Sequence, residues 1–430
     1  MIVRPLIDQE RIIRELEALA EFSDTPKPAI TRILFTKPDL EARAYLKGLC
    51  EEAGLSLRED GLGNIFARWE GSAPDLPAVG TGSHFDAIPY AGMYDGTVGV
   101  LGGLEAIRSL QRSGFKPRRS IELLIFTAEE PTRFGIGCLG SRALAGVLGP
   151  DSLRELKDPE GRTLEEVRWE AGYMGRLEDV ALPEGYYSAF VELHIEQGPV
   201  LEQERVPLGI VTAIAAPASL RVHLEGVGGH AGTVLMPDRR DALCAAAEII
   251  LGVEAFAKNS GSINTVATTG FCEVYPNAVN SVPSRVRLEV DIRDIEQSRR
   301  DQVIRSVIQG VEQVCTRRDI KYSVEIINID PPAKAGSEVL KALVASCGEA
   351  GVKFKFMVSR AYHDALFMAR ITPTAMLFIP CRQGVSHRPD EYAAPEDIAR
   401  GVHVLALTLA KLSLAEDKAV PKDDPVLLDE

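Results

Sequence analysis

The chain has 430 residues, 45% of them hydrophobic and 26% charged, and a formal net charge of −14. This length exceeds what one hydrophobic core usually serves, so we expect two domains. The acidic balance, without a run of Lys or Arg, argues against nucleic acid or an anionic membrane surface as a partner.

The seven cysteines are scattered and contain no Cys-x-x-Cys pair, which is typical of reduced thiols in a cytosol-like compartment. The N-terminal residues lack the apolar core of a signal peptide. No stretch approaches the roughly 18 uninterrupted apolar residues of a membrane helix. We therefore expect a cytoplasmic protein without a membrane segment.

Hydrophobic spacing predicts the first elements in chain order. Residues 8–21 read as an amphipathic helix, because apolar side chains recur there at helical spacing. Short apolar runs then predict strands at 76–82, 121–127, 189–193 and 374–379, with a helix at 98–110. This alternation predicts an α/β fold, with a mixed β-sheet flanked by helices on both faces.

The pattern changes near residue 214. Segments 220–224 and 285–292 alternate apolar with polar residues, as strands with one face in water do. An Ala-rich helix at 241–256 lies between them, and the α/β pattern returns after residue 330. We therefore expect an inserted α+β domain at 214–330 and a catalytic domain built from 1–213 and 331–430. Only the last dozen residues read as a loose tail.

Acidic and imidazole side chains fall at or just after the predicted strand ends. They form four clusters: His84 with Asp86 and Asp95, Glu129 with Glu130, His194, and His387. Ligands of open α/β sheets bind outside the carboxyl ends of strands, so these clusters are expected to converge. Three His with carboxylates suit Zn²⁺, Mn²⁺ or Co²⁺, and the lack of a cysteine argues against a structural zinc site.

Each cluster alone has a simpler interpretation. A single His at a strand end is usually a hydrogen-bonded structural residue, and the Glu129–Glu130 pair could be a solvated face. Asp95 before a helix could be an N-cap. Their co-occurrence in a chain with only seven His favours a shared metal site.

The inserted domain carries a second set of polar residues. Glycines surround His230, a turn-like stretch contains Asn280, and Arg293 ends a strand. An Arg can hold a substrate carboxylate with two hydrogen bonds, and an Asn can support it. The alternatives are a surface ion pair for Arg293 and a simple turn for Asn280.

Together these motifs resemble the M20 dinuclear metallohydrolases, and within them the amidase branch. That branch includes N-carbamoyl-amino-acid hydrolases, β-ureidopropionases, and allantoate and ureidoglycolate amidohydrolases. The resemblance covers nearly the whole chain, and segments 126–135, 211–220 and 359–369 are most similar to plant-type (S)-ureidoglycolate amidohydrolases. It implies two divalent metal ions, Mn²⁺ in preference to Zn²⁺ or Co²⁺, and an inserted lid and dimerisation domain.

The resemblance also implies residue roles. One metal would be held by His84, Asp95 and His194, and the other by Asp95, Glu130 and His387. Glu129 would be the general base, and Asp86 would orient His84. The substrate-binding residues would be Gln197, Asn280, Arg293, Tyr362 and His363. His230 would stabilise the oxyanion, reaching the site from the partner subunit of a homodimer.

The implied reaction is hydrolysis of the ureido C–N bond of (S)-ureidoglycolate to glyoxylate, ammonia and CO2. The nearest alternatives are an N-carbamoyl-L-amino acid hydrolase and an allantoate amidohydrolase. A dinuclear peptidase is disfavoured by His194 and Arg293. A metal-binding protein without activity is disfavoured because Glu129 stands beside the complete ligand set.

Overall fold

The computed structural model describes residues 5–416, and the chain divides into two compact units. Of the described residues, the first unit comprises 5–212, 334–357 and 363–416, and the second comprises 213–333 and 358–362. The second unit therefore takes in a short segment, 358–362, that the predicted insertion at 214–330 does not contain. The predicted loose tail lies outside the described residues.

A nine-stranded mixed sheet organises the first unit, in the order β15-β8-β17-β7-β4-β6-β3-β2, with β16 paired to β8. The strands are β2 (Ser56–Glu59), β3 (Ile65–Trp69), β4 (Ala78–His84), β6 (Ile121–Phe126), β7 (Tyr187–Ile195), β8 (Leu208–Ile214), β15 (Ala333–Lys334), β16 (Phe354–Ser359) and β17 (Thr374–Ile379). The four central strands β17, β7, β4 and β6 are parallel, whereas β8, β3 and β2 pair antiparallel with their neighbours. The carboxyl ends of the four parallel strands therefore meet at one edge of the sheet.

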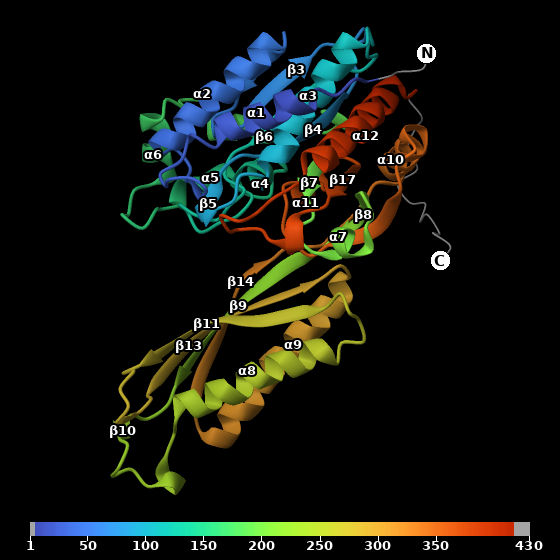
Figure 1. Ribbon diagram of the computed structural model, residues 1–430. Coiled ribbons are helices and arrows are strands. Elements are labelled where there is room, and N and C mark those ends of the chain that lie inside the picture. Colours follow the sequence, from blue (N-terminus) through green and yellow to red (C-terminus); the bar gives the residue numbers. More distant parts are fainter. Residues whose placement is uncertain (1–4, 417–430) are drawn as a thin grey trace. The chain divides into compact units, whose positions relative to one another are not determined.

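Helices cover both faces of this sheet (Figure 1). One face packs against α1 (Gln9–Leu19), α2 (Lys37–Glu52), α3 (Thr97–Arg112), α10 (Ser337–Ala350) and α12 (Pro395–Leu414). The other packs against α4 (Leu139–Leu144), α5 (Pro150–Glu155), α6 (Leu164–Glu170) and α11 (Ala365–Met368). Successive strand residues point to opposite faces, so Leu123 and Leu124 belong to different cores. The predicted helix-flanked mixed sheet is confirmed.

The remaining elements of the first unit are short: β1 (Ile30–Arg32), β5 (Ala87–Ala91), α7 (Val200–Glu204), and the 3₁₀ helices η1 (Leu177–Asp179) and η3 (Arg382–Gly384). Strand β7 is longer than its predicted range of 189–193. It pairs in register with β17 as far as Ile195, and this pairing keeps His194 extended inside the strand.

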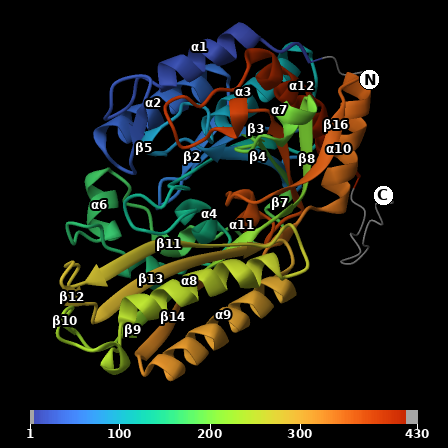
Figure 2. The ribbon, with the colours of Figure 1, turned by 60° about the horizontal axis from the view of Figure 1, so that its bottom comes forward.

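The second unit is a four-stranded antiparallel sheet in the order β11-β13-β9-β14. Its strands are β9 (Ala216–Glu225), β11 (Val266–Tyr275), β13 (Arg285–Asp294) and β14 (Lys321–Ile329). Figure 2 shows α8 (Ala242–Lys258) and α9 (Gln297–Arg318) lying side by side against it. Alternate residues of β13 are buried beneath these helices, which confirms the predicted one-sided strand pattern.

A small ladder of β10 (Gly229–His230) and β12 (Ser281–Val282), with the 3₁₀ helix η2 (Met236–Asp238), completes the second unit. Within residues 5–416, none of the helices combines the length and the apolar character that a membrane crossing requires.

Candidate metal centre

The parallel core of the first unit explains why distant polar residues meet. His84 is the last residue of β4, Glu129 follows β6, and His194 lies near the end of β7. His387 follows β17 after a short loop. Because these strands are parallel neighbours, their ends bring the four clusters together at one edge of the sheet.

The first group consists of His84, Asp95 and His194, whose nearest ligand atoms all lie within 4.8 Å of one another. The Nε2 atoms of His84 and His194 lie 3.7 and 3.2 Å from Asp95 Oδ1. Their Nδ1 atoms face backbone oxygens, of Asp86 at 3.2 Å and Ile195 at 2.9 Å. Those bonds fix each ring and direct Nε2 toward the aspartate, as in metal-binding histidines.

The second group consists of Asp95, Glu130 and His387, again within 4.8 Å of one another. His387 Nε2 lies 3.1 Å from Asp95 Oδ2 and 3.3 Å from Glu130 Oε1. Asp95 thus turns one carboxylate oxygen toward each group. This is the arrangement that a carboxylate bridging two ions would need.

Asp95 does not cap the helix that follows it. The N-cap of α3 is Gly96, and no side chain caps that helix, so the capping interpretation is wrong. Gly96 has a left-handed φ of 67°, and a Cβ there would lie 2.5 Å from His84 Nε2. Only a glycine lets the backbone pass this close to the imidazole.

Glu129 and Glu130 are both buried but have different surroundings. Glu129 Oε2 lies 3.9 Å from His84 Nε2, and Glu129 belongs to neither ligand group. The Cys138 thiol donates a hydrogen bond of 3.4 Å to its Oε1. Burial raises the pKa of Glu129 well above its usual value, so this carboxyl readily holds a proton.

Asp86 organises two of these segments at once. Its carboxylate accepts hydrogen bonds from the backbone N–H groups of Glu129 at 3.1 Å and Glu130 at 3.0 Å. Its Oδ1 also lies 3.4 Å from His84 Nδ1. Asp86 therefore fixes the strand end after β6 relative to the imidazole at the end of β4.

The electrostatics of the cluster favour bound positive charge. Burial would raise the pKa of Asp95, but hydrogen bonds from His194, His387 and His84 hold it well below its usual range. Burial, with the nearby Asp95 carboxylate, raises the pKa of Glu130 to about 7. Within the described residues, these carboxylates form their ion pairs with histidines rather than with Lys or Arg. Imidazole and carboxylate donors around so much negative charge fit divalent transition-metal ions.

Two predicted substrate-binding residues lie beside this cluster. Gln197 donates a hydrogen bond of 2.8 Å from Nε2 to Asp95 Oδ2, and the described part of the chain offers its buried Oε1 no partner. His363 is buried, with its ring centroid 4.6 Å from that of His194. Its ligand atom also lies within 4.8 Å of those of Glu192 and His194.

The other predicted substrate-binding residues belong to the second unit. Arg293 is paired with Asp291 at 2.7 Å and also donates to the backbone oxygen of Arg360. The Tyr362 hydroxyl donates to Asp330 Oδ2 at 2.5 Å. Each of these two side chains therefore already has a protein partner.

His230 and Asn280 are brought together, because Ala231 N–H donates to the Asn280 backbone oxygen and β10 pairs with β12. Both side chains are exposed. Arg293, in contrast, lies at the other end of β13, where it pairs with Pro217.

Several polar residues near the cluster were not predicted as site residues. Glu391 and Ser386 contact Asp95 or its backbone, and Glu192 accepts from Ser83 and from Ala365 N–H. Asp364 accepts from Ser141 at 2.5 Å. For Asp364, the one signal in the sequence was its position directly after the predicted substrate-binding residue His363. Glu192 sits in an apolar strand and Glu391 in an ordinary polar loop, where neither residue type stands out.

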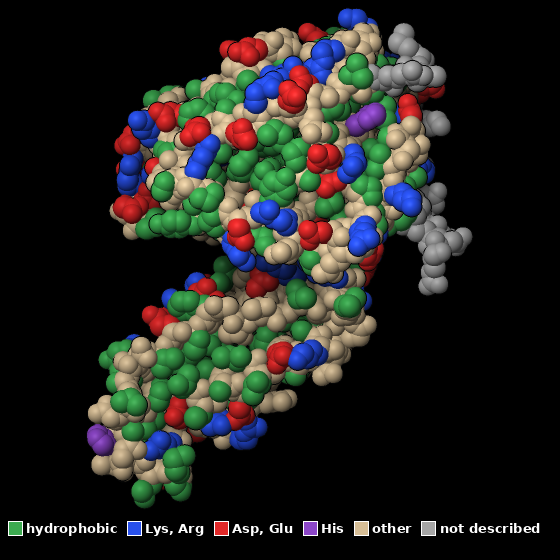
Figure 3. Space-filling view, in the orientation of Figure 1, with side chains coloured by type: hydrophobic (Ala, Val, Ile, Leu, Met, Phe, Trp, Pro, Cys, Tyr) green, Lys and Arg blue, Asp and Glu red, His purple; other side chains and the backbone are tan. Residues whose placement is uncertain are grey.

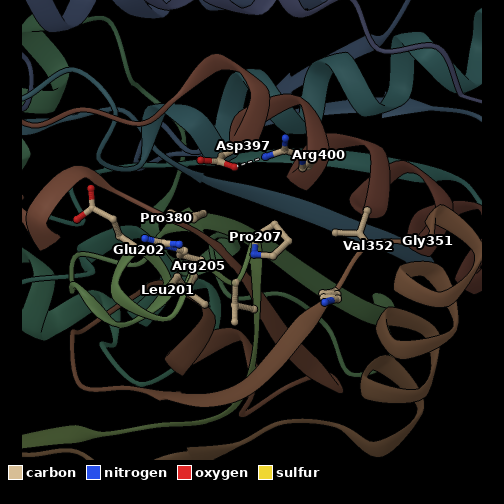
Figure 4. A pocket seen from close by; sticks show the side chains of 11 residues that line it. Leu201, Glu202, Arg205, Pro207, Gly351, Val352, Pro380, Asp397 and Arg400 are labelled. Atoms are coloured by element: carbon tan, nitrogen blue, oxygen red, sulfur yellow. Dashed lines mark hydrogen bonds and ion pairs between the residues drawn. The ribbon is translucent and has the colours of Figure 1, made fainter.

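A pocket of about 560 Å³ lies elsewhere on the first unit (Figure 4). Its lining comes from α7 and the loop after it, the loop after α10, and the start of α12, where Asp397 pairs with Arg400. None of the predicted site residues lines it, so this pocket is separate from the cluster.

Two groups of imidazole and carboxylate side chains that share one aspartate, with a further glutamate outside both, form a candidate metal centre of the kind that metal-dependent hydrolases use. The family assignment follows directly. A model of peptidase family M20/M25/M40 matches residues 80–411, and the chain belongs to that family. The family and the buried clusters together suggest a dinuclear site.

Individual relatives narrow the comparison. Over 413 residues the chain is 53% identical to ureidoglycolate hydrolase from Oryza sativa subsp. japonica, covering 95% of this chain and 85% of the relative. It is 37% identical over 412 residues to N-carbamoyl-L-amino acid amidohydrolase from Geobacillus stearothermophilus, covering 96% and 100%. Crystal structures of AtUAH in complex with (S)-hydroxyglycine or glyoxylate match with a TM-score of 0.87 and 51% identity, covering 96% of this chain and 99% of the other. The predicted membership of the M20 family and of its amidase branch is confirmed.

Proposed function

We propose that this protein hydrolyses the ureido C–N bond of (S)-ureidoglycolate, releasing glyoxylate, ammonia and CO2. The observation that carries the proposal is the pair of ligand groups sharing Asp95, with Glu129 beside them but in neither group. The 53% identity to a ureidoglycolate hydrolase directs the same chemistry to this substrate.

The metal ligands would be His84, Asp95 and His194 for one ion, and Asp95, Glu130 and His387 for the other. Divalent ions there would polarise the scissile carbonyl and increase the acidity of the attacking water. We propose Mn²⁺ as the native ion, in preference to Zn²⁺ or Co²⁺, from the resemblance to the amidase branch. The donor set accepts all three.

Glu129 would move the proton. Its carboxylate can accept a proton from the attacking water and return it to the leaving nitrogen. Burial raises its pKa, which favours the proton-carrying state between the two steps. The Cys138 thiol holds one carboxylate oxygen, which leaves the other facing His84 and the ligand groups.

We propose that the remaining predicted side chains bind the polar groups of the substrate. The Gln197 Oε1 is a buried acceptor that a ureido N–H could satisfy. Arg293 would hold the carboxylate by replacing its bond to Asp291, and Tyr362 and His363 would lie near the α-carbon. A site that pairs with the α-hydroxyl rejects analogues lacking that hydroxyl, because its own polar group is then left unpaired.

His230 and Asn280 would act in a homodimer, as residues of the partner subunit. Arg285 begins β13 and Arg293 is its last residue but one, eight residues and roughly 26 Å apart at 3.3 Å per residue. The β10–β12 ladder, which holds His230 and lies beside Asn280, joins the sheet at the Arg285 end, where Gly226 N–H donates to the Ser284 backbone oxygen. One small ureido acid cannot span that distance, so Arg293 and the pair His230–Asn280 of a single chain would serve different sites.

The surface around His230 supports this interpretation. Exposed apolar side chains flank it on both sides, namely Val227, Leu235, Met236 and Val279. Figure 3 shows hydrophobic side chains gathered on the surface at the end of the second unit where β10 lies. Apolar groups of this kind typically mark an interface. The second unit would then be a lid and dimerisation domain.

All seven cysteines lie in the described part of the chain and have free thiols. Free thiols fit a reducing compartment, and we propose a cytoplasmic location.

The test is ammonia release, with Mn²⁺ supplied, from (S)-ureidoglycolate, allantoate and N-carbamoyl-L-alanine. We expect kcat/KM for (S)-ureidoglycolate to exceed the other two by roughly 100-fold or more, given the cost of an unpaired polar group. A higher value for N-carbamoyl-alanine would reassign the substrate but retain the amidohydrolase chemistry. No ammonia from any of the three would reject the proposed function.

A further inference from the structure

Glu391 joins two parts of the chain that each carry a residue of the second group. It lies between His387 and α12, and its side chain is buried. Its Oε1 accepts hydrogen bonds from the backbone N–H groups of Tyr94 at 2.8 Å and Asp95 at 3.0 Å. Its Oε2 accepts from the Ser386 hydroxyl at 2.8 Å. One carboxylate thus holds the turn of Asp95 and the loop of His387.

The position of His387 depends on such a contact more than the positions of His84 and His194 do. The side chain of His387 is 46% exposed, whereas those of His84 and His194 are 2% and 1% exposed. His387 also has a left-handed φ of 59°, a conformation that costs free energy for a residue with a side chain. A strand positions each of the other two histidines, but the position of His387 depends on its loop.

The Ser386 hydroxyl connects this contact to ion binding. It lies 2.9 Å from Asp95 Oδ2 as well as 2.8 Å from Glu391 Oε2, and its single hydrogen can be donated to only one of them. A cation on Asp95 Oδ2 would compete for that oxygen's lone pairs. The Ser386 hydrogen would then be donated to Glu391, which would strengthen the contact on the His387 loop.

Gly92 shows how closely the two segments are packed. A Cβ added to Gly92 would lie 2.3 Å from Glu391 Cβ. Any side chain at residue 92 must therefore displace Glu391. This gives a second way to disturb the contact without changing Glu391 itself.

We infer that Glu391 is a positioning residue for the second group: it holds the Asp95 turn and the His387 loop together and so sets the affinity of that group for its metal ion. The inference rests on the proposed dinuclear site. Residues that hold metal ligands in place typically affect metal affinity by about 10- to 100-fold when they are changed.

The test is a Mn²⁺ binding isotherm measured by equilibrium dialysis on the full chain. Wild-type protein should bind two ions per chain. Glu391→Gln keeps an acceptor for the two backbone N–H groups but presents an amide to Ser386. We expect it to weaken the binding of one ion about tenfold or more and that of the other less, because His387 belongs to only one group whereas Asp95 belongs to both. Gly92→Ala should give the same selective loss, and activity should return when Mn²⁺ is raised to saturation.

Glu105→Gln is the matched control. Glu105 is also fully buried and joins distant segments, by accepting from Asp8 N–H and from Arg11, but it does not contact either ligand group. It should lower the melting temperature and leave both Mn²⁺ affinities unchanged. If Glu391→Gln weakens both ions equally, or neither, the inference is wrong. A wild-type stoichiometry below two overturns it together with the dinuclear site. If the wild-type protein binds two ions but does not hydrolyse ureidoglycolate, only the proposed substrate is rejected.

Discussion

Glu129 and Glu130 are adjacent in sequence, yet only one of them reaches a ligand group. Ala128 takes a left-handed φ of 52°, and Asp86 accepts from both glutamate N–H groups, so the backbone turns between strand β6 and the pair. That turn places Glu130 Oε1 3.3 Å from His387 and leaves Glu129 3.9 Å from His84. The different surroundings of the two carboxylates therefore depend on backbone geometry, and so would their proposed roles.

Glu129→Gln should retain both metal ions and lose turnover, since it removes the proton carrier but neither ligand group. General acid–base groups typically contribute about 10²- to 10⁴-fold, and we expect a loss at the upper end or beyond. Metal content and kcat, measured on one preparation, check this. The control is Glu130→Gln, which should lose metal as well as activity. If Glu129→Gln loses metal in proportion to activity, Glu129 is a ligand.

The proposed substrate contacts can also be tested one residue at a time. Arg293→Ala should weaken binding of ureidoglycolate, allantoate and N-carbamoyl-alanine alike, because all three carry a carboxylate. Tyr362→Phe should narrow the kcat/KM gap between them, because it removes the hydroxyl that we propose pairs with a polar group on the α-carbon. Asp330→Asn tests whether the effect of Tyr362 acts through its hydrogen bond to Asp330. An unchanged ranking in Tyr362→Phe would exclude Tyr362 from discrimination.

Among the elements, the four parallel strands could be predicted from sequence because each is a short apolar run followed by a polar cluster. Their spatial order could not be predicted, since it depends on pairings between segments such as β7 and β17 that lie far apart in the chain. The extension of β7 to Ile195 could not be predicted for the same reason, because it depends on pairing with β17. Contacts of residues like Glu391 require the three-dimensional neighbourhood, because a Glu in a polar loop carries no local signal.

Gly96, the N-cap of α3, tests whether the start of this helix must pass close to His84. Gly96→Ala would place a Cβ 2.5 Å from His84 Nε2, so we expect loss of metal from the first group. Gly114 is the matched control: it follows the same helix, has a φ of 74°, and has open space around its Cβ position. Gly114→Ala should cost about 1–2 kcal/mol of stability from backbone strain and keep its metal. Metal content and thermal unfolding of the two variants show whether metal is lost through backbone strain or through the contact with His84.

For the whole molecule, the separation of Arg293 from His230 and Asn280 along β13 gives a test of the homodimer. Mixing inactive His230→Ala with inactive Glu129→Gln subunits should restore activity, because half of the dimers then hold one intact site. The recovery should approach about a quarter of wild-type activity for a symmetric dimer.

Asn280→Ala sharpens this test. Mixed with Glu129→Gln it should also recover activity, but mixed with His230→Ala it should not. The two residues lie beside each other at the β10–β12 ladder and would be supplied by the same subunit. Recovery of activity when Asn280→Ala is mixed with His230→Ala would contradict a shared site. So would a lack of recovery when either variant is mixed with Glu129→Gln, once subunit exchange has been demonstrated.

The position of β7 between β4 and β17 has a consequence for biosynthesis. β4 and β7 have left the ribosome long before β17, because residues 196–373 must be made in between. At typical synthesis rates this takes about 10 to 35 seconds. Throughout that interval the nascent chain carries a nine-residue, mainly apolar strand with one edge unpaired, and an exposed strand edge of this kind can template aggregation. Production of this enzyme in a foreign host should therefore depend on chaperones that bind nascent chains.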